Sequence, residues 1–99
     1  MQFVVIAHDY KDGNALERRL AVREEHLKNA GKMFEKGNWL FASALLDENG
    51  IMNGSIIFCD YESEEELRQD WLENEIYVKE KVWEKITIRK AKVAEHKST

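Results

Sequence analysis

The sequence predicts one α+β domain whose strands and helices follow each other in the order βαββαβ. Three observations predict this class. A length of 99 residues suits one compact domain and is too short for two separate cores. Hydrophobic residues make up 43% of the chain and charged residues 34%, a balance typical of folded proteins. Finally, β-branched and aromatic runs alternate with segments whose apolar residues recur at helical spacing.

The chain begins with a strand and a long helix. Residues 3–7 form an apolar, β-branched run typical of a strand. Asn14, followed three residues later by Glu17, resembles a capping box that opens a helix. The apolar stripe expected along this helix consists of Leu16, Leu20, Leu27, Ala30 and Phe34. Gly37 is expected just past its end, where glycine is favoured.

A hairpin of two strands follows. Residues 39–46 and 51–61 are rich in β-branched and aromatic side chains, and the polar turn residues 47–50 separate them. Gly54 predicts a bend or a close backbone approach within the later strand.

The last part of the chain predicts a helix and a strand. Ser63 and Glu66 form a second capping box. Leu67 and Trp71 are an apolar pair at i,i+4 on the helix that this box opens. Residues 83–91, in which isoleucines alternate with polar side chains, predict the fourth strand.

Apolar residues occupy both faces of the first three predicted strands. An antiparallel sheet with one solvated face should alternate apolar and polar residues, and these strands do not. Two helices cover only one face of a four-stranded sheet. The simplest cover for the other face is the same face of a second copy, which would place a shared cavity between two sheets. We therefore expect a homodimer; the alternative is a sheet whose second face is exposed.

Charge and composition exclude several classes of partner. The formal net charge of −4 argues against a nucleic-acid-binding protein, which gains affinity by neutralising phosphates. An RNA-binding domain is also disfavoured because the strand over residues 53–58 contains one aromatic residue in an acidic context. The chain has no signal-peptide pattern and no apolar run long enough to span a membrane. We expect a cytoplasmic, single-domain protein over residues 1–99, with residues 92–99 as a polar tail.

Few residues point to chemistry. The sequence contains no phosphate loop, no paired-cysteine metal pattern and no nucleophile elbow, so we expect neither a metal nor a cofactor. The single cysteine, Cys59, lies in an apolar strand and is expected in the core. His26 lies at the border of the buried helix face. An imidazole there suits a general base, while a hydrogen-bonded structural histidine is the alternative.

The segment from Asp9 to Leu27 resembles the first third of a YciI-like (YCII-related) protein. The family pattern R-x-x-H-L stands here at residues 23–27. Further positions that are similar to the family are Gly37, Gly54-Ser55 and Tyr77-Val78. The resemblance implies a ferredoxin-like fold with a four-stranded antiparallel sheet, pairing into a dimeric α+β barrel. It also implies a His–Asp pair in a cleft.

On this resemblance, His26 is the catalytic base and an acidic residue orients it. Two acids compete for that role. Asp9 matches the acid that the family keeps after its first strand, and Glu75 stands where the family has an aspartate. We expect Asp9 to be the partner, because the first strand is central in a βαββαβ sheet and its end opens beside the start of the first helix.

The same resemblance supplies a substrate-binding set. Arg23 is expected to hold an anionic or phenolic oxygen, with Glu75, Tyr77 and Ser43 completing the site. The sequence departs from the family twice: Ser43-Ala44 replaces Gly-Pro, and Glu75 to Tyr77 replaces D-P-Y without its proline.

Two functions follow from these observations. The first is a cofactor-free small-molecule enzyme of a lyase, dehydrohalogenase-like or isomerase-like kind. The second is a non-catalytic metabolite-binding or regulatory dimer that uses the same cleft.

Overall fold

The computed structural model describes residues 1–95 and has the predicted order of strands and helices. The elements are β1 (Gln2–Asp9), α1 (Ala15–Glu35), β2 (Trp39–Leu46), β3 (Met52–Asp60), α2 (Glu64–Asp70), the 3-10 helix η1 (Leu72–Asn74), α3 (Ile76–Lys79) and β4 (Trp83–Lys90). All strand pairs are antiparallel and the sheet order is β2-β3-β1-β4. The predicted α+β, ferredoxin-like fold is confirmed.

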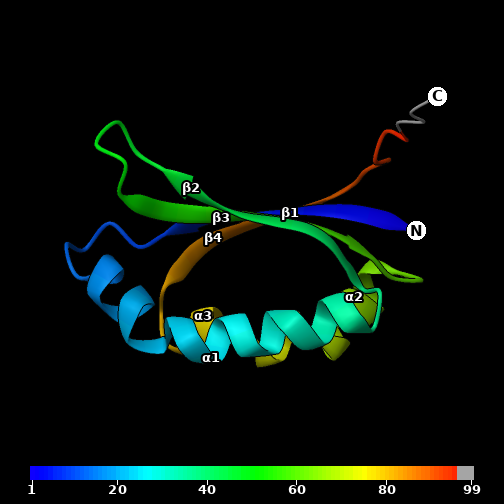
Figure 1. Ribbon diagram of the computed structural model, residues 1–99, viewed down its shortest axis with the longest axis horizontal. Helices are drawn as coiled ribbons and strands as arrows, with labels where there is room; N and C mark the ends of the chain where they lie inside the picture. The colour runs from blue at the N-terminus through cyan, green and yellow to red at the C-terminus, as the bar shows by residue number, and fades with distance from the viewer. Residues whose placement is uncertain (96–99) are drawn as a thin grey trace.

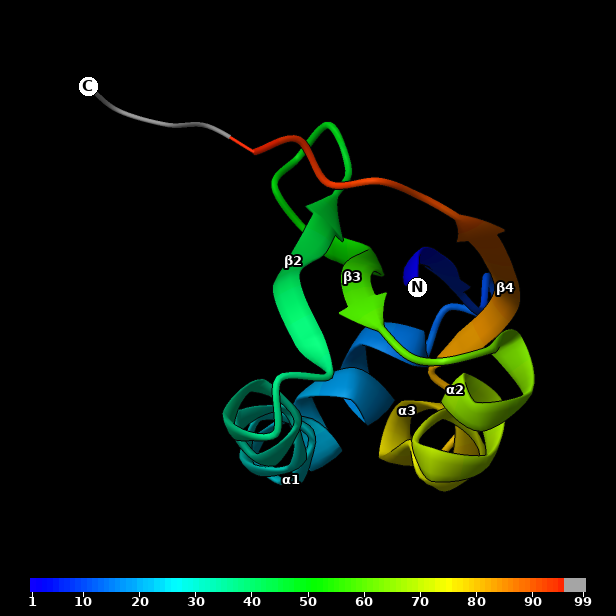
Figure 2. The ribbon, with the colours of Figure 1, turned by 90° about the vertical axis from the view of Figure 1, so that its right-hand side faces the viewer.

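The helices lie on one face of the sheet. Figures 1 and 2 show α1 running beneath the β2 side, while α2 and α3 lie beneath the β4 side. No helix of residues 1–95 covers the opposite face (Figure 1). No helix in this part of the chain is long and apolar enough to cross a membrane.

The core lies between the sheet and the helices, and side-chain alternation in β1 determines its position. Phe3, Val5 and Ala7 point toward the helices and are buried, whereas Val4 and Ile6 point to the other face and are half-buried. The largest fully buried side chains of the core are Tyr77, Phe3, Ile57, Leu67, Val5, Val82 and Cys59.

The ends of α1 agree only in part with the capping prediction. Asn14 occupies the N-cap position, but its side chain makes no capping hydrogen bond. Its backbone N–H instead donates to Asp12 Oδ1 at 3.0 Å, and Asp12 also pairs with Arg18 at 2.9 Å. At the other end Gly37 adopts a left-handed conformation (φ 82°), as expected of a glycine after a helix.

The apolar stripe predicted for α1 is wrong in its main members. Leu20, Leu27 and Phe34 are 55%, 49% and 43% exposed. Ala30 is buried as predicted, and the other side chains that α1 buries are Ala15 and Arg19. The inward face of this helix is therefore lined partly by polar side chains, and the large leucines lie beside it.

The segment after the hairpin is broken rather than one helix. Ser63 caps α2 as predicted, because its Oγ accepts a hydrogen bond from the Glu66 N–H at 3.1 Å. Leu67 and Trp71 are buried as predicted. The chain then leaves helical geometry twice, at Trp71 and at Glu75, whose extended backbone makes it the N-cap of α3. Glu75 therefore lies between two short helices and not at the end of a long one.

Gly54 allows a close approach between β1 and β3. A Cβ atom at this position would lie 2.6 Å from the Ala7 carbonyl oxygen, which is closer than real Cβ atoms come. The β2–β3 register also shifts beside it, between Leu45 and Leu46. The predicted close backbone approach is confirmed.

The end of the chain carries no further element within the described residues. Residues 91–95 form neither helix nor strand, and the rest of the predicted polar tail lies outside the described residues.

Candidate functional site

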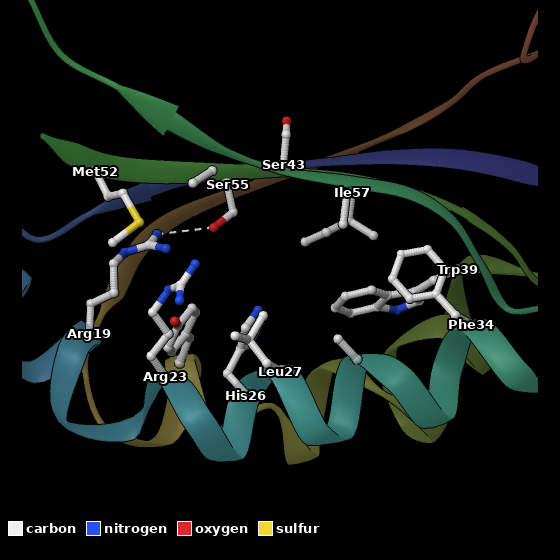
Figure 3. Close-up of a pocket in the computed structure, with 14 residues that line it drawn as sticks. Arg19, Arg23, His26, Leu27, Phe34, Trp39, Ser43, Met52, Ser55 and Ile57 are labelled. Carbon is white, nitrogen blue, oxygen red and sulfur yellow. Dashed lines mark hydrogen bonds between the residues drawn. The ribbon is translucent and has the colours of Figure 1, made fainter. Parts of the chain in front are cut away.

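A cavity of about 250 Å³ lies between α1 and the β2–β3 side of the sheet. Its lining comes from α1, β2, β3 and Tyr77 of α3 (Figure 3). The small residues Ala30, Ala42 and Ala44 face this space from the helix and the strand, and their short side chains leave room for it. The sequence predicts a cavity on the opposite face, between two sheets. The cavity found here lies on the helical face and within one chain.

His26 projects from α1 into this cavity and is paired with Glu75. The Nδ1 atom of His26 lies 2.9 Å from Glu75 Oε2, and both side chains are largely buried, at 11% and 2% exposure. Asp9, the partner favoured on the sequence, makes no hydrogen bond or ion pair with His26 within residues 1–95 and is bonded to Arg19 instead. That expectation is wrong, because Asp9 is fully engaged elsewhere.

Glu75 is held in place by three hydrogen-bond donors. Its Oε1 accepts from Trp71 Nε1 at 3.0 Å, and its Oε2 accepts from the Tyr77 N–H at 3.0 Å and faces His26. Burial alone would raise the pKa of Glu75, but the hydrogen bond and the charge of His26, with the other two donors, outweigh it and lower the pKa. Glu75 is therefore a carboxylate at neutral pH, and the Nδ1–H of His26 donates to it.

The His26 ring is fixed by aromatic neighbours as well. It stacks on the Tyr77 ring, with centroids 3.8 Å apart and planes within 8° of parallel. Trp83 lies edge-on to the imidazole at 6.1 Å, and Trp39 is tilted against it at the same distance. Stacking and the Glu75 hydrogen bond together determine the plane and the tautomer of His26. The neutral ring then carries its lone pair on Nε2.

Asp9 forms a buried, bidentate ion pair with Arg19. Arg19 Nε donates to Asp9 Oδ2 and Arg19 Nη2 donates to Asp9 Oδ1, both at 2.9 Å. Nη2 also donates to the Gly54 carbonyl and to Ser55 Oγ. The long arginine side chain reaches from the first turns of α1 to the end of β1.

The two ion pairs are connected through Tyr77. The Arg19 guanidinium lies over the Tyr77 ring, 4.8 Å from its centroid. Arg19 and His26 are seven residues apart on α1, which is about 10.5 Å along the helix axis. The Tyr77 ring contacts both side chains and therefore lies between them. A continuous series of contacts thus runs from Asp9 through Arg19 and Tyr77 to His26 and Glu75.

The structure brings Arg23, Tyr77 and Ser43 to the lining of the cavity with His26, but the Ser43 hydroxyl points away from the space. Figure 3 shows Arg19, Arg23 and His26 extending from α1 toward the sheet, while the Ser43 side chain points away from the cavity. The register explains this: Ser43 pairs with Ile56, on the uncovered face. Glu75 is also removed from the cavity surface, because it lies behind His26 and does not line the space.

Several polar side-chain atoms of the residues that line the cavity have no hydrogen-bond partner within residues 1–95. Within residues 1–95, Trp39 Nε1 is the one side-chain polar atom that is fully enclosed without a hydrogen bond. His26 Nε2 and the Tyr77 hydroxyl make no hydrogen bond to this part of the chain either, and they belong to residues that line the cavity. His26 Nε2 is not fully enclosed and can meet a ligand, whereas the Tyr77 side chain is almost completely buried, at 1% exposure.

Other reactive groups do not form a site. No cluster of three or more metal-binding side chains occurs within residues 1–95. Cys59 is completely buried, as expected, and burial raises the pKa of its thiol to about 12. It is therefore a neutral core side chain and not a nucleophile.

Arg19 is the site residue that the sequence reasoning missed. A signal for it was present: residues 19, 23, 26 and 30 are spaced by four, three and four, so they share one helical face. The conspicuous leucines at positions 20 and 27 indicated a neighbouring face instead. Two arginines and a histidine on the inward face of a helix are a stronger indication of a site than of a core.

Comparison with solved structures agrees with this fold. The 5-chloro-2-hydroxyhydroquinone dehydrochlorinase of Burkholderia phenoliruptrix AC1100, in complex with 2,5-dihydroxybenzoquinone, matches with a TM-score of 0.80 at 19% identity over 95% of this chain and 96% of its own. A dimeric ferredoxin-like protein from an uncultured marine organism matches with a TM-score of 0.54 at 16% identity, covering 99% and 100% of the two chains. A structural-genomics protein from Agrobacterium tumefaciens has a TM-score of 0.53 at 16% identity over 95% and 94%.

The family assignment rests on the sequence. No curated protein matches the chain significantly. The family model of the YCII-related domain matches residues 1–92, which is nearly the whole chain. The chain therefore belongs to the YCII-related domain family.

Proposed function

We propose that this protein is an enzyme that moves a proton on a small molecule, with His26 as the general base and Glu75 as its orienting acid. The observation that carries the proposal is the 2.9 Å contact between His26 Nδ1 and the Glu75 carboxylate at the wall of a cavity. A histidine oriented by a buried carboxylate, with its second nitrogen free, is the arrangement that general-base catalysis requires.

The proposed step uses groups that the chain itself supplies. A C–H or O–H bond of the substrate breaks, the proton forms a bond with His26 Nε2, and the electron pair stays on the substrate. Glu75 stabilises the imidazolium that results. This step is common to lyases, dehydrohalogenases and isomerases, and the returned proton or a departing halide completes the reaction.

The comparison with the dehydrochlorinase supports this class of reaction. That protein is described with a ring-shaped oxygenated ligand, and its fold matches nearly the whole chain at 19% identity. A substituted aromatic or quinol-type substrate suits the flat side chains around this cavity, which include Trp39, Tyr77 and Phe34. The proposal for this chain rests on the His26–Glu75 geometry, and the relative indicates which compounds to assay first.

The experiment is an assay in deuterated water with hydroxylated and halogenated ring compounds, including 5-chloro-2-hydroxyhydroquinone. Halide release and deuterium incorporation are followed together. The His26→Gln variant should lose about 10²–10⁴-fold in rate, and Arg68→Gln, on the far side of α2, should retain the wild-type rate. Turnover that is unchanged in His26→Gln contradicts the proposal. Saturable ligand binding without turnover would favour the metabolite-binding alternative.

We also propose that the chain forms a homodimer through the uncovered face of the sheet. Val4, Ile6, Ile56 and Phe58 are half-buried on this face, and Phe41 is 60% exposed beside them. A second copy would bury this apolar surface. The dimeric state described for the marine ferredoxin-like protein supports the proposal.

A further inference from the structure

We infer that the cavity binds a small planar oxyanion, with its charged oxygen beside Arg19 and Arg23 and its apolar body toward Phe34 and Trp39. This inference rests on the proposed function and names the class of molecule on which it operates. An enolate or phenolate, the form that a substrate takes when His26 removes its proton, belongs to this class.

The charge of the cavity differs from that of the whole chain. The chain carries a net charge of −4 and 19 acidic residues among 99, yet no aspartate or glutamate lines the cavity. The cationic side chains of Arg19 and Arg23 do line it. The positive character of this surface, within an acidic protein, is therefore local to the cavity and complements a negative ligand.

The protein itself uses only some of the N–H donors of Arg19 and Arg23. Asp9 neutralises the charge of Arg19, but the bonds of Arg19 use its Nε and Nη2, and none within residues 1–95 uses Nη1. Arg23 has neither an ion-pair nor a hydrogen-bond partner in the same residues. Burial raises the pKa of Tyr77, although Arg19 and Arg23 oppose this, so its hydroxyl stays protonated and remains a donor.

The cavity changes in polarity along α1. Its polar side chains on the helix are Arg19, Arg23 and His26, at the end nearer the helix N-terminus. Beyond them the lining is apolar, with Leu27, Ala30 and Phe34 on the helix and Trp39 and Ile57 on the sheet (Figure 3). A ligand with one charged oxygen and a flat apolar body fits both halves, whereas a uniformly polar ligand would leave the second half without apolar contacts.

Binding at Arg23 and proton transfer at His26 are linked because one helix carries both side chains. Arg23 and His26 are three residues apart on one helix, so their Cβ atoms are about 5–6 Å apart. An oxygen held by Arg23 therefore places a neighbouring atom of the same molecule near His26 Nε2. When His26 takes a proton from that atom, the negative charge develops on the oxygen beside Arg23, where a cation stabilises it.

The test is a binding experiment that needs no turnover. Titration calorimetry compares 2,5-dihydroxybenzoate with 2,5-dihydroxybenzamide, two compounds of nearly the same shape that differ in charge. The wild-type protein should bind the benzoate about tenfold or more tightly than the amide. Arg23→Gln should remove this preference, while Arg68→Gln, which loses the same charge on exposed α2, should retain it. Ala44→Leu, which fills the cavity without changing a charge, should weaken both ligands.

The outcomes separate this inference from the proposed function. Equal affinity for the two compounds, binding of neither, or a charge preference that persists in Arg23→Gln overturns the oxyanion site. The His26→Gln variant should still bind the benzoate while lacking turnover, because Arg23 is intact. A protein that binds the benzoate through Arg23 but shows no His26-dependent turnover would leave the oxyanion site supported and refute the enzyme.

Discussion

Asp9 and Arg19 form a two-pronged ion pair in which both side chains are almost completely buried, at 4% and 3% exposure. This pair holds the end of the central strand β1 against the first turns of α1. Because Arg19 also lies against Tyr77, and Tyr77 stacks on His26, the pair positions the catalytic candidate without touching it. Asp9, the acid expected to pair with His26, thus acts on it indirectly, through Arg19 and Tyr77.

Replacing Asp9 should reveal how much this buried pair matters for stability. Asp9→Asn leaves the Arg19 charge buried without its counter-ion, and we expect the free energy of unfolding to fall by about 3–5 kcal/mol. Glu64→Gln is the matched control, since it breaks the exposed Arg68–Glu64 pair and should cost less than about 1 kcal/mol. Urea denaturation measures both. Similar small losses in the two variants would mean that the buried pair is not a structural support.

Glu75 should determine the tautomer of His26. In the wild-type protein, nitrogen-15 NMR of the neutral imidazole should show the hydrogen on Nδ1, because the Glu75 carboxylate accepts it. In Glu75→Gln a single amide oxygen replaces the two carboxylate oxygens that accept from His26, Trp71 and Tyr77. The tautomer with the hydrogen on Nδ1 should therefore no longer be preferred. Asp9→Asn should preserve it, provided that the variant is folded. Finding the hydrogen on Nε2 in the wild-type protein would contradict the assignment.

Glu75 should also contribute to stability at acidic pH. Its pKa is lowered in the folded protein from the reference value of 4.5, so the unfolded chain binds the proton more readily. The resulting stabilisation is fully present above the unfolded pKa and is lost as the pH falls through the folded pKa. Between about pH 5 and pH 3 the wild type should therefore lose more stability than Glu75→Gln. Parallel acid dependences in urea melts would show that Glu75 does not titrate in this way.

The second helical region should be a main support of the core. Leu67 is completely buried, and Leu67→Ala should reduce the free energy of unfolding by about 2–5 kcal/mol because it removes core volume. Leu20→Ala makes the same chemical change on α1, at a side chain that is 55% exposed, and should alter stability by about 0.5 kcal/mol or less. A loss below about 1 kcal/mol for Leu67→Ala would show that the region packs in another way.

The uncovered face of the sheet should be a dimer interface. Sedimentation equilibrium at micromolar concentration should give twice the chain mass of 11.6 kDa. Ile6→Lys places a charge in the middle of this face and should shift the protein to monomer, whereas Leu20→Lys on the exposed side of α1 should not. A wild-type protein that sediments as a monomer would contradict the proposed homodimer.

The fold was predictable from local patterns, and the pairing at the site was not. The β-branched and aromatic runs of the strands, the Ser63 cap and the glycine after α1 depend on residues close together in sequence, so each leaves a local signal. The partner of His26 depends on where a broken helical segment returns to the sheet. That geometry is set by the breaks at Trp71 and Glu75, which have no proline to mark them. Asp9 and Glu75, from opposite halves of the chain, were therefore both candidates for the partner of His26. The sequence does not show that Asp9 is bound by the buried Arg19.

The distance in sequence between His26 and Glu75, which is 49 positions, links chemistry to the integrity of the fold. Glu75 is carried by α2, η1 and α3, which contain seven, three and four residues and are too short to persist without packing. If residues 64–79 detach while the sheet stays paired, the carboxylate leaves the imidazole and the base loses its orientation. Loss of turnover in mild denaturant should therefore precede the loss of sheet structure, which would make activity a sensitive reporter of partial opening in this protein.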